Sequence, residues 1–151
     1  MSEQTLQVFI DGVVRYFDHI ENSAVKVGTP YLVENNEPAA FDVTGIIGVT
    51  GPYRGCVYFT APRILLKHLL LKMGENDTCT AHVFDLVGEV ANTISGNARS
   101  EFGNEFNISV PVVIEGAPDN IYLPGSARSY VIPIYWKTYN AAVVICLSGD
   151  R

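Results

Sequence analysis

The sequence lacks any run of basic residues. Its ten lysines and arginines stand against sixteen aspartates and glutamates, which gives a net charge of -6 over 151 residues. Proteins bind nucleic acid and anionic membranes through cationic patches, so the sequence predicts neither as a partner. Only 17% of residues are charged whereas 48% are hydrophobic, which argues against long disordered regions. We therefore expect a single domain over residues 1–151 with its own core.

Long hydrophobic runs and cysteine motifs are also missing. The longest apolar stretch, from Ile64 to Leu71, is interrupted by Lys67 and His68 and is too short to span a bilayer. The first residues, MSEQTLQVFIDG, include acidic side chains and lack the basic and then apolar order of a signal peptide. The three cysteines form no CxxC pair. We therefore expect a cytoplasmic protein with reduced thiols.

Two common enzyme signatures are absent as well. The sequence contains neither the glycine-rich phosphate loop of kinases and P-loop enzymes nor the GxSxG elbow of serine hydrolases. Those classes of activity are therefore not predicted. Function has to be sought in side-chain patterns on individual elements.

The order of predicted elements favours an α+β fold. Apolar residues at helical spacing predict helices from about residue 5 to 21, over 63–73, and from about Cys79 to Phe102, with Asp77 or Thr78 as the N-cap of the last. Six extended runs predict strands within 24–34, 41–51, 56–62, 106–116, 129–138 and 141–149. Because strands follow strands, we expect a mostly antiparallel six-stranded sheet packed with three helices.

The longest predicted helix has two contrasting faces. At about 100° per residue, one arc is entirely apolar and must face the core. Its members are Val83, Leu86, Val87, Val90, Ala91, Ile94 and Ala98. Four residues on the opposite arc, at spacings of four, three and four, form an exposed line that we call the outer stripe: Asp85, Glu89, Asn92 and Gly96. Gly88 and Ser95 are expected to flank it with little side-chain bulk.

The two glycines on this face weaken the helix. Each costs about 1 kcal/mol relative to alanine, and an exposed face offers no packing that would compensate. Close approach of a partner would explain Gly88 and Gly96, and the carboxylate of Glu89 and the carboxamide of Asn92 would then enter a cleft of that partner. The alternative is a solvated acidic face, which is common on surface helices.

Residues 85–99, DLVGEVANTISGNAR, resemble the DxxxExxN signature of the CheC, CheX and FliY family of chemotaxis phosphatases. Residues 41–51 and 55–59 look like the strand pair of that family, and residues 106–113 resemble the strand that follows its motif helix. The resemblance extends over about residues 5–147 and implies a CheC-like fold. Because the signature occurs once, the chain is most similar to the CheX members, which implies a homodimer formed by joining sheets.

The substrate of that family is a phosphorylated receiver domain of the CheY type, which supplies its own Mg²⁺ and a lysine beside the aspartyl phosphate. The resemblance therefore implies no cofactor or metal bound by this chain. Asn92 would orient the attacking water, because a carboxamide both donates and accepts hydrogen bonds. Glu89 would pair with the receiver lysine, Asp85 would extend the anionic surface, and Gly88 and Gly96 would permit close approach.

Other interpretations of this helix stay open. His82, Asp85 and Glu89 share one side and could begin a metal site, although no HxxxH or CxxC motif supplies further ligands. A family member could also dock on a receiver or a flagellar switch component without hydrolysis, and residues 97–99, beginning with Asn97, depart from the family pattern. A receiver outside chemotaxis is a further possible substrate.

Overall fold

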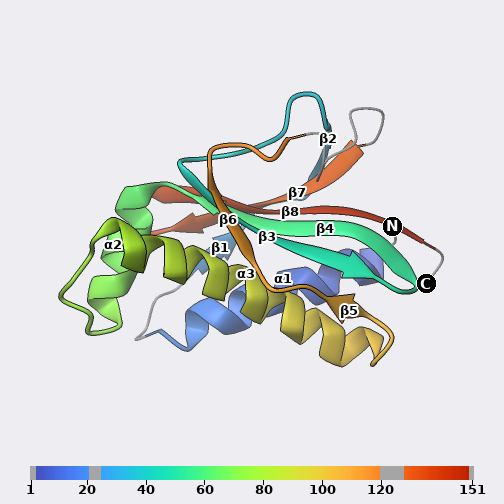
Figure 1. Cartoon of the computed structure of the whole chain (residues 1–151), viewed down its shortest axis with the longest axis horizontal. Helices are drawn as coiled ribbons and strands as arrows, with labels where there is room; N and C mark the ends of the chain where they lie inside the picture. Colours follow the sequence, from blue (N-terminus) through green and yellow to red (C-terminus); the bar gives the residue numbers. More distant parts are fainter. Residues whose placement is uncertain (1–2, 21–24, 120–127, 150–151) are drawn as a thin grey trace.

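The computed structural model describes residues 3–20, 25–119 and 128–149. It contains three helices, as the sequence predicts: α1 (Glu3–Asp18), α2 (Arg63–Lys72) and α3 (Thr80–Phe102). α1 and α3 lie next to each other on one face of a sheet, and α2 packs against α3 (Figure 1). None of the helices in these ranges is both long and apolar enough to cross a membrane.

The sheet is antiparallel throughout the described residues. Its strands are β1 (Val25–Val27), β2 (Tyr31–Glu34), β3 (Val43–Thr50), β4 (Tyr53–Ala61), β5 (Asn107–Ile108), β6 (Val112–Glu115), β7 (Arg128–Trp136) and β8 (Tyr139–Gly149). The central order is β7-β8-β4-β3, with β1 and β2 both paired to the outer side of β7 and β5 and β6 both paired to β3. The sheet therefore stays open at both edges, and the expected α+β class is confirmed.

The expectation of six strands is wrong, because two of the expected strands are each divided. Residues 28–30 separate β1 from β2, and residues 109–111 separate β5 from β6. Each interruption contains a proline, Pro30 or Pro111, which has no N–H to donate to a neighbouring strand. Pro133 of β7 lies opposite the first interruption, where its carbonyl accepts a hydrogen bond of 2.9 Å from the Gly28 N–H. The sheet therefore has eight strands.

The boundaries of α3 agree closely with the sequence pattern. The helix ends where Gly103 adopts a φ of 101°, a conformation that favours glycine. At its start the expected cap is wrong, because Cys79 occupies the N-cap position and makes no side-chain cap. Asp77 instead accepts a hydrogen bond from the Cys79 N–H through Oδ1, at 3.1 Å.

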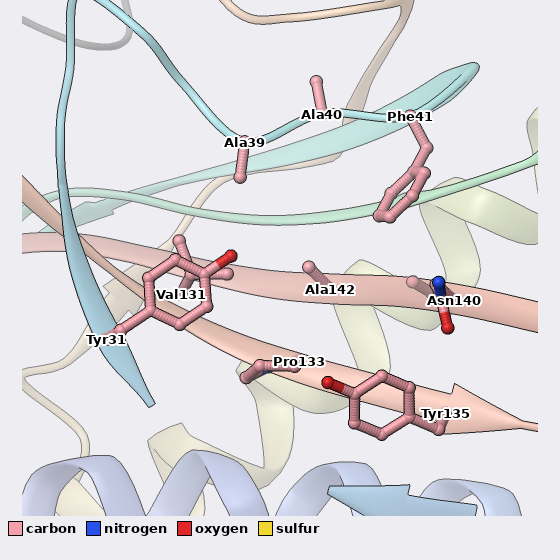
Figure 2. A pocket seen from close by; sticks show the side chains of 10 residues that line it. Tyr31, Ala39, Ala40, Phe41, Val131, Pro133, Tyr135, Asn140 and Ala142 are labelled. Atoms are coloured by element: carbon pink, nitrogen blue, oxygen red, sulfur yellow. The ribbon is translucent and has the colours of Figure 1, made fainter. Parts of the chain in front are cut away.

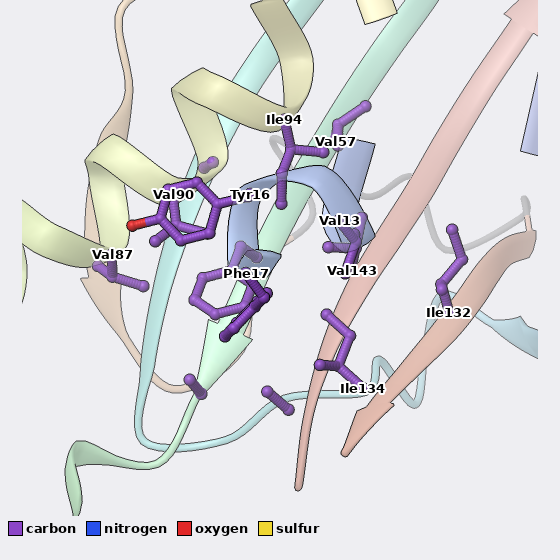
Figure 3. Close-up of a cluster of buried hydrophobic side chains, with 14 of the residues drawn as sticks. Val13, Tyr16, Phe17, Val57, Val87, Val90, Ile94, Ile132, Ile134 and Val143 are labelled. Atoms are coloured by element: carbon purple, nitrogen blue, oxygen red, sulfur yellow. The ribbon is translucent and has the colours of Figure 1, made fainter. Parts of the chain in front are cut away.

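The core lies between the sheet and the pair α1 and α3 (Figure 3). All seven residues predicted for the inner arc of α3 are buried, none more than 2% exposed. They meet β3 and β4 on one side and α1 on the other. Gly45 of β3 lets the helix lie close to the sheet, because a Cβ there would be only 2.7 Å from the Val87 carbonyl oxygen. The orientation of α3 fixes which of its residues remain at the surface.

Candidate functional site

The outer stripe lies at the surface as one line along α3. Asp85, Glu89 and Asn92 are exposed, and Gly96 is half-buried with open space where a Cβ would stand. Among the described residues, the structure gives none of the three polar side chains a hydrogen bond or an ion pair. Two carboxylates and one carboxamide are therefore available together to a binding partner.

Glu89 lies where two hollows meet. The larger, which we call the Glu89 hollow, has a volume of about 510 Å³ and is lined by Tyr16, His19, Ile20, Lys72, Met73, Glu89 and Thr93. The smaller, of about 280 Å³, is lined by Leu70, Met73, Glu75, His82, Asp85, Leu86 and Glu89. The outer stripe is therefore flanked by depressions between α3 and the ends of α1 and α2, and not by a flat surface.

The lining of these hollows is acidic. Glu75, Asp85 and Glu89 contribute three carboxylates, whereas Lys72 is the one lysine or arginine among the described lining residues. Leu70, Leu86 and Ile20 add apolar surface beneath the charged groups. A partner with a cationic side chain beside apolar ones would match this surface.

Gly88 does not belong to the accessible surface, contrary to what the sequence pattern predicted. It is buried, and a Cβ at this position would lie 3.2 Å from Val113 Cγ2 and 3.5 Å from Pro111 Cβ. Its missing side chain therefore makes room for Pro111, between β5 and β6, and for Val113 of β6. Ser95 is also buried, and Asn97 is half-buried at the contact with α1, where a Cβ on Gly12 would be 3.7 Å from the Asn97 Cβ.

The structure brings together a different set of potential metal ligands from the one considered from sequence. Asp77, Cys79 and His82 place one ligand atom each within 4.8 Å of one another before and in the first turn of α3. Asp85 and Glu89 are not part of this group. A hydrogen bond to the Asp77 carbonyl raises the pKa of His82, and a metal would have to displace the proton that this bond favours.

Tyr16 is the residue of this site that the sequence pattern did not single out. It lies on α1, is 9% exposed and lines the Glu89 hollow. Burial raises its pKa, and the Glu89 carboxylate raises it further. In the sequence, Tyr16 is one of many aromatic residues on apolar faces, so only the packing of α1 against α3 reveals its proximity to Glu89.

A further cavity, of about 300 Å³, lies on the other face of the sheet (Figure 2). Its walls come from β2, β7, β8 and the segment after β2, and include Tyr31, Phe41, Pro133 and Tyr135. Val131 and Ala142 in this cavity belong to a buried cluster separate from the one beneath α1 and α3. The sheet therefore separates this cavity from the outer stripe.

Comparison with known protein families gives a match over most of the chain. The family described as chemotaxis phosphatase CheX matches residues 43–135. This region includes β3, β4, α2, all of α3 and nearly all of β7. No curated protein matches the chain.

Solved structures match over nearly the whole chain. A CheC-like superfamily protein from Shewanella sp. PV-4 is 30% identical, with a TM-score of 0.83 and coverage of 99% of this chain and 100% of that one. The chemotaxis protein CheX from Vibrio vulnificus is 26% identical, with a TM-score of 0.79 and coverage of 96% and 99%. A chain in the CheX-CheY-BeF3-Mg²⁺ complex from Borrelia burgdorferi, at 19% identity, TM-score 0.75 and coverage of 95% and 97%, shows the same fold. The expected CheC-like fold is confirmed.

Proposed function

Because the chain belongs to the CheX family of chemotaxis phosphatases, we propose that it hydrolyses the aspartyl phosphate of a CheY-type receiver domain in the cytoplasm. The outer stripe is the observation that carries this proposal. Glu89 and Asn92 are exposed one turn apart on α3, and neither side chain has a hydrogen bond or an ion pair among the described residues. Both groups are therefore presented to another molecule.

Asn92 is proposed to position the attacking water. Phosphoryl transfer passes through a loose transition state, so a phosphatase contributes mainly by holding water in line with the leaving oxygen. The amide oxygen of Asn92 would accept a hydrogen bond from the water, and its NH₂ group would donate one to the phosphoryl oxygens or the water. This role needs orientation and not a strong base, which suits a neutral side chain.

Glu89 is proposed to fix the receiver in register by pairing with its lysine. The acidic lining of the two hollows favours such a cationic group. Asp85 would extend the same anionic surface, and Gly96 would allow the receiver to approach the helix closely, since no atom lies within 4 Å of the position of a Cβ.

Mg²⁺ is proposed to come with the receiver and not to be held by this chain. The complex from Borrelia burgdorferi, which contains Mg²⁺ and BeF3 together with CheX and CheY, supports this proposal, because BeF3 stands in for a phosphoryl group. The cation would neutralise charge on the phosphoryl oxygens, while Asn92 and Glu89 would supply the orienting contacts.

We also propose that the protein forms a homodimer by joining sheets. The sheet has open edges, and β2 at one of them exposes large apolar side chains, with Tyr31 49% and Leu32 44% exposed. Unpaired edges with apolar side chains favour association. Sedimentation equilibrium should give twice the chain mass, and the chain mass itself would contradict the proposal.

The decisive experiment measures the decay of a phosphorylated CheY-type receiver in Mg²⁺, with and without this protein. We expect the wild-type protein to accelerate decay and Asn92→Ala to lose at least about 100-fold of that acceleration, because misplacing a reacting group has effects of this size. An Asn92→Ala variant as active as the wild type would contradict the mechanism. Binding without acceleration by the wild type would instead identify a docking module.

A second variant tests the ion pair separately from the chemistry. Glu89→Lys places a positive charge opposite the receiver lysine, so binding of the phosphorylated receiver should weaken at least about tenfold. Glu89→Ala should weaken it less, because it removes the attraction without adding repulsion. Unchanged binding by both variants would show that the assigned pair is wrong.

A further inference from the structure

The hydroxyl group of Tyr16 is buried without a partner. Its ring packs edge-on against Phe17, with the centroids 5.4 Å apart. Within the part of the chain that the structure describes, no group forms a hydrogen bond with the hydroxyl. Burying a hydroxyl in this way is unfavourable, and phenylalanine would fill the same space. Packing of the core therefore does not explain the hydroxyl.

The hydroxyl points away from the middle of the core. Figure 3 shows it at the margin of the buried cluster, directed away from Val13 and Val143. Tyr16 and Glu89 line the same hollow. The raised pKa of Tyr16 keeps the phenol neutral, so it retains a proton to donate.

Glu89 is the strongest acceptor available in this hollow. A carboxylate only accepts hydrogen bonds, and those it accepts are stronger than bonds between neutral groups. Lys72 offers only donors, while His19 and Thr93 offer neutral acceptors. Glu89 is exposed, so its side chain has the freedom to turn toward Tyr16.

We propose that Tyr16 is a positioning residue for Glu89: its O–H donates a hydrogen bond to one carboxylate oxygen and leaves the other for the cationic side chain of the docked receiver. The functional part of this inference rests on the proposed function. A long, exposed side chain loses rotational freedom when it binds. Holding Glu89 in advance reduces that loss and so strengthens docking.

The hydrogen bond is tested in the free protein by NMR of the Glu89 side chain at neutral pH. A donor that holds one carboxylate oxygen restricts the rotation of this long, exposed side chain, so Tyr16→Phe should shift its three-bond χ1 couplings toward rotationally averaged values. His19, Lys72, Glu75, His82 and Asp85, the other charged or titratable groups that line the two hollows with Glu89, are the same in both proteins. Unchanged couplings would overturn the proposal.

The positioning role is tested by kinetics with the phosphorylated receiver. Tyr16→Phe should raise KM about tenfold, as expected for a lost hydrogen bond to a charged group, and leave kcat within about twofold. In a Glu89→Ala background the same substitution should have no further effect on KM. A fall in kcat alone, or the same KM increase without Glu89, would overturn the role.

Tyr53→Phe is the matched control. Tyr53 is also buried, and its hydroxyl lies 3.4 Å from that of Thr5, away from the outer stripe. It should leave both KM and the Glu89 side-chain couplings unchanged, and an equal effect would show that Tyr16 acts only through the core. If the wild type binds the receiver but does not accelerate decay, the proposed function fails, and the Glu89 couplings together with the receiver dissociation constant still decide the inference.

Discussion

The inner arc of α3 and its outer stripe belong to the same 23-residue helix but differ in almost every physical property. The inner arc is apolar and at most 2% exposed, so its side chains contribute to stability through burial. The outer stripe is polar, and its side chains have no hydrogen bond or ion pair among the described residues. One helix therefore holds the fold together with one face and presents functional groups with the other, so the two properties can be changed separately.

The two glycines of α3 sharpen this contrast. The sequence pattern treats Gly88 and Gly96 alike, as small residues beside an exposed line. In the structure Gly88 is buried against Pro111 and Val113, whereas Gly96 faces open space. Gly88 serves the packing of this chain and only Gly96 leaves room for a partner. Four substitutions test the comparison, in decreasing order of their expected effect on the free energy of unfolding.

Ile94→Ala should have the largest effect on stability. Ile94 is 1% exposed in the core, and truncating a buried isoleucine lowers the free energy of unfolding by about 2–5 kcal/mol. Urea denaturation followed by circular dichroism measures this change. Activity per folded molecule should persist, because Ile94 lies on the face of α3 opposite the outer stripe. A loss below about 1 kcal/mol would contradict the assignment of the inner arc.

Gly45→Ala should destabilise the protein by about 1–3 kcal/mol, the range for an overpacked core. The new Cβ would lie 2.7 Å from the Val87 carbonyl oxygen, and a backbone atom cannot move without shifting α3. Gly48→Ala on the same strand is the control, because its nearest neighbour is the side-chain hydroxyl of Ser109 at 3.3 Å. If both variants lose the same free energy of unfolding, then the close approach of α3 to Gly45 does not matter for stability.

Gly96→Ala should raise the free energy of unfolding by about 1 kcal/mol, since alanine favours the helix and meets no atom within 4 Å. The same change at Gly88 should raise the free energy of unfolding less, because the new Cβ would crowd Val113. Receiver binding should weaken for Gly96→Ala only. Destabilisation by Gly96→Ala, measured in the same urea titrations, would mean that this part of the helix is not open.

Asn92→Ala should change the free energy of unfolding least, by no more than about 0.5 kcal/mol, as is usual for exposed positions. It should nevertheless remove the acceleration of receiver dephosphorylation. Ser100→Ala, on an exposed part of the same helix, provides the control and should retain activity. Thermal unfolding of both variants distinguishes lost function from lost structure. A clearly lower melting temperature for Asn92→Ala would show that the outer stripe also contributes to stability.

Much of the fold was predictable because its signals are local. The spacing of Val83, Val87 and Ile94 predicts the buried arc from helical geometry alone, and α3 ends at Phe102 as expected. The division of two strands into four was not predicted. Pro30 and Pro111 lie in the two interruptions, but whether a strand that contains a proline bends or breaks depends on its pairing with distant segments.

Part of the candidate site was predictable from local spacing as well. The line formed by Asp85, Glu89 and Asn92 follows from their spacing, and its exposure follows from the apolar arc opposite. The hollows beside this line, their acidic lining and the proximity of Tyr16 to Glu89 were not predicted. Residues separated by more than 70 positions are brought together only by the packing of α1 against α3.

The sequence by itself determined where the helices form and which face of α3 is polar, because helical periodicity is a property of neighbouring residues. The tertiary structure alone decided that two strands are divided, that Gly88 is covered and Gly96 is open, and that Tyr16 and Glu89 line the same hollow. The physical reason is that burial and proximity depend on contacts between elements that are distant in the chain, and these contacts have no local signature in the sequence.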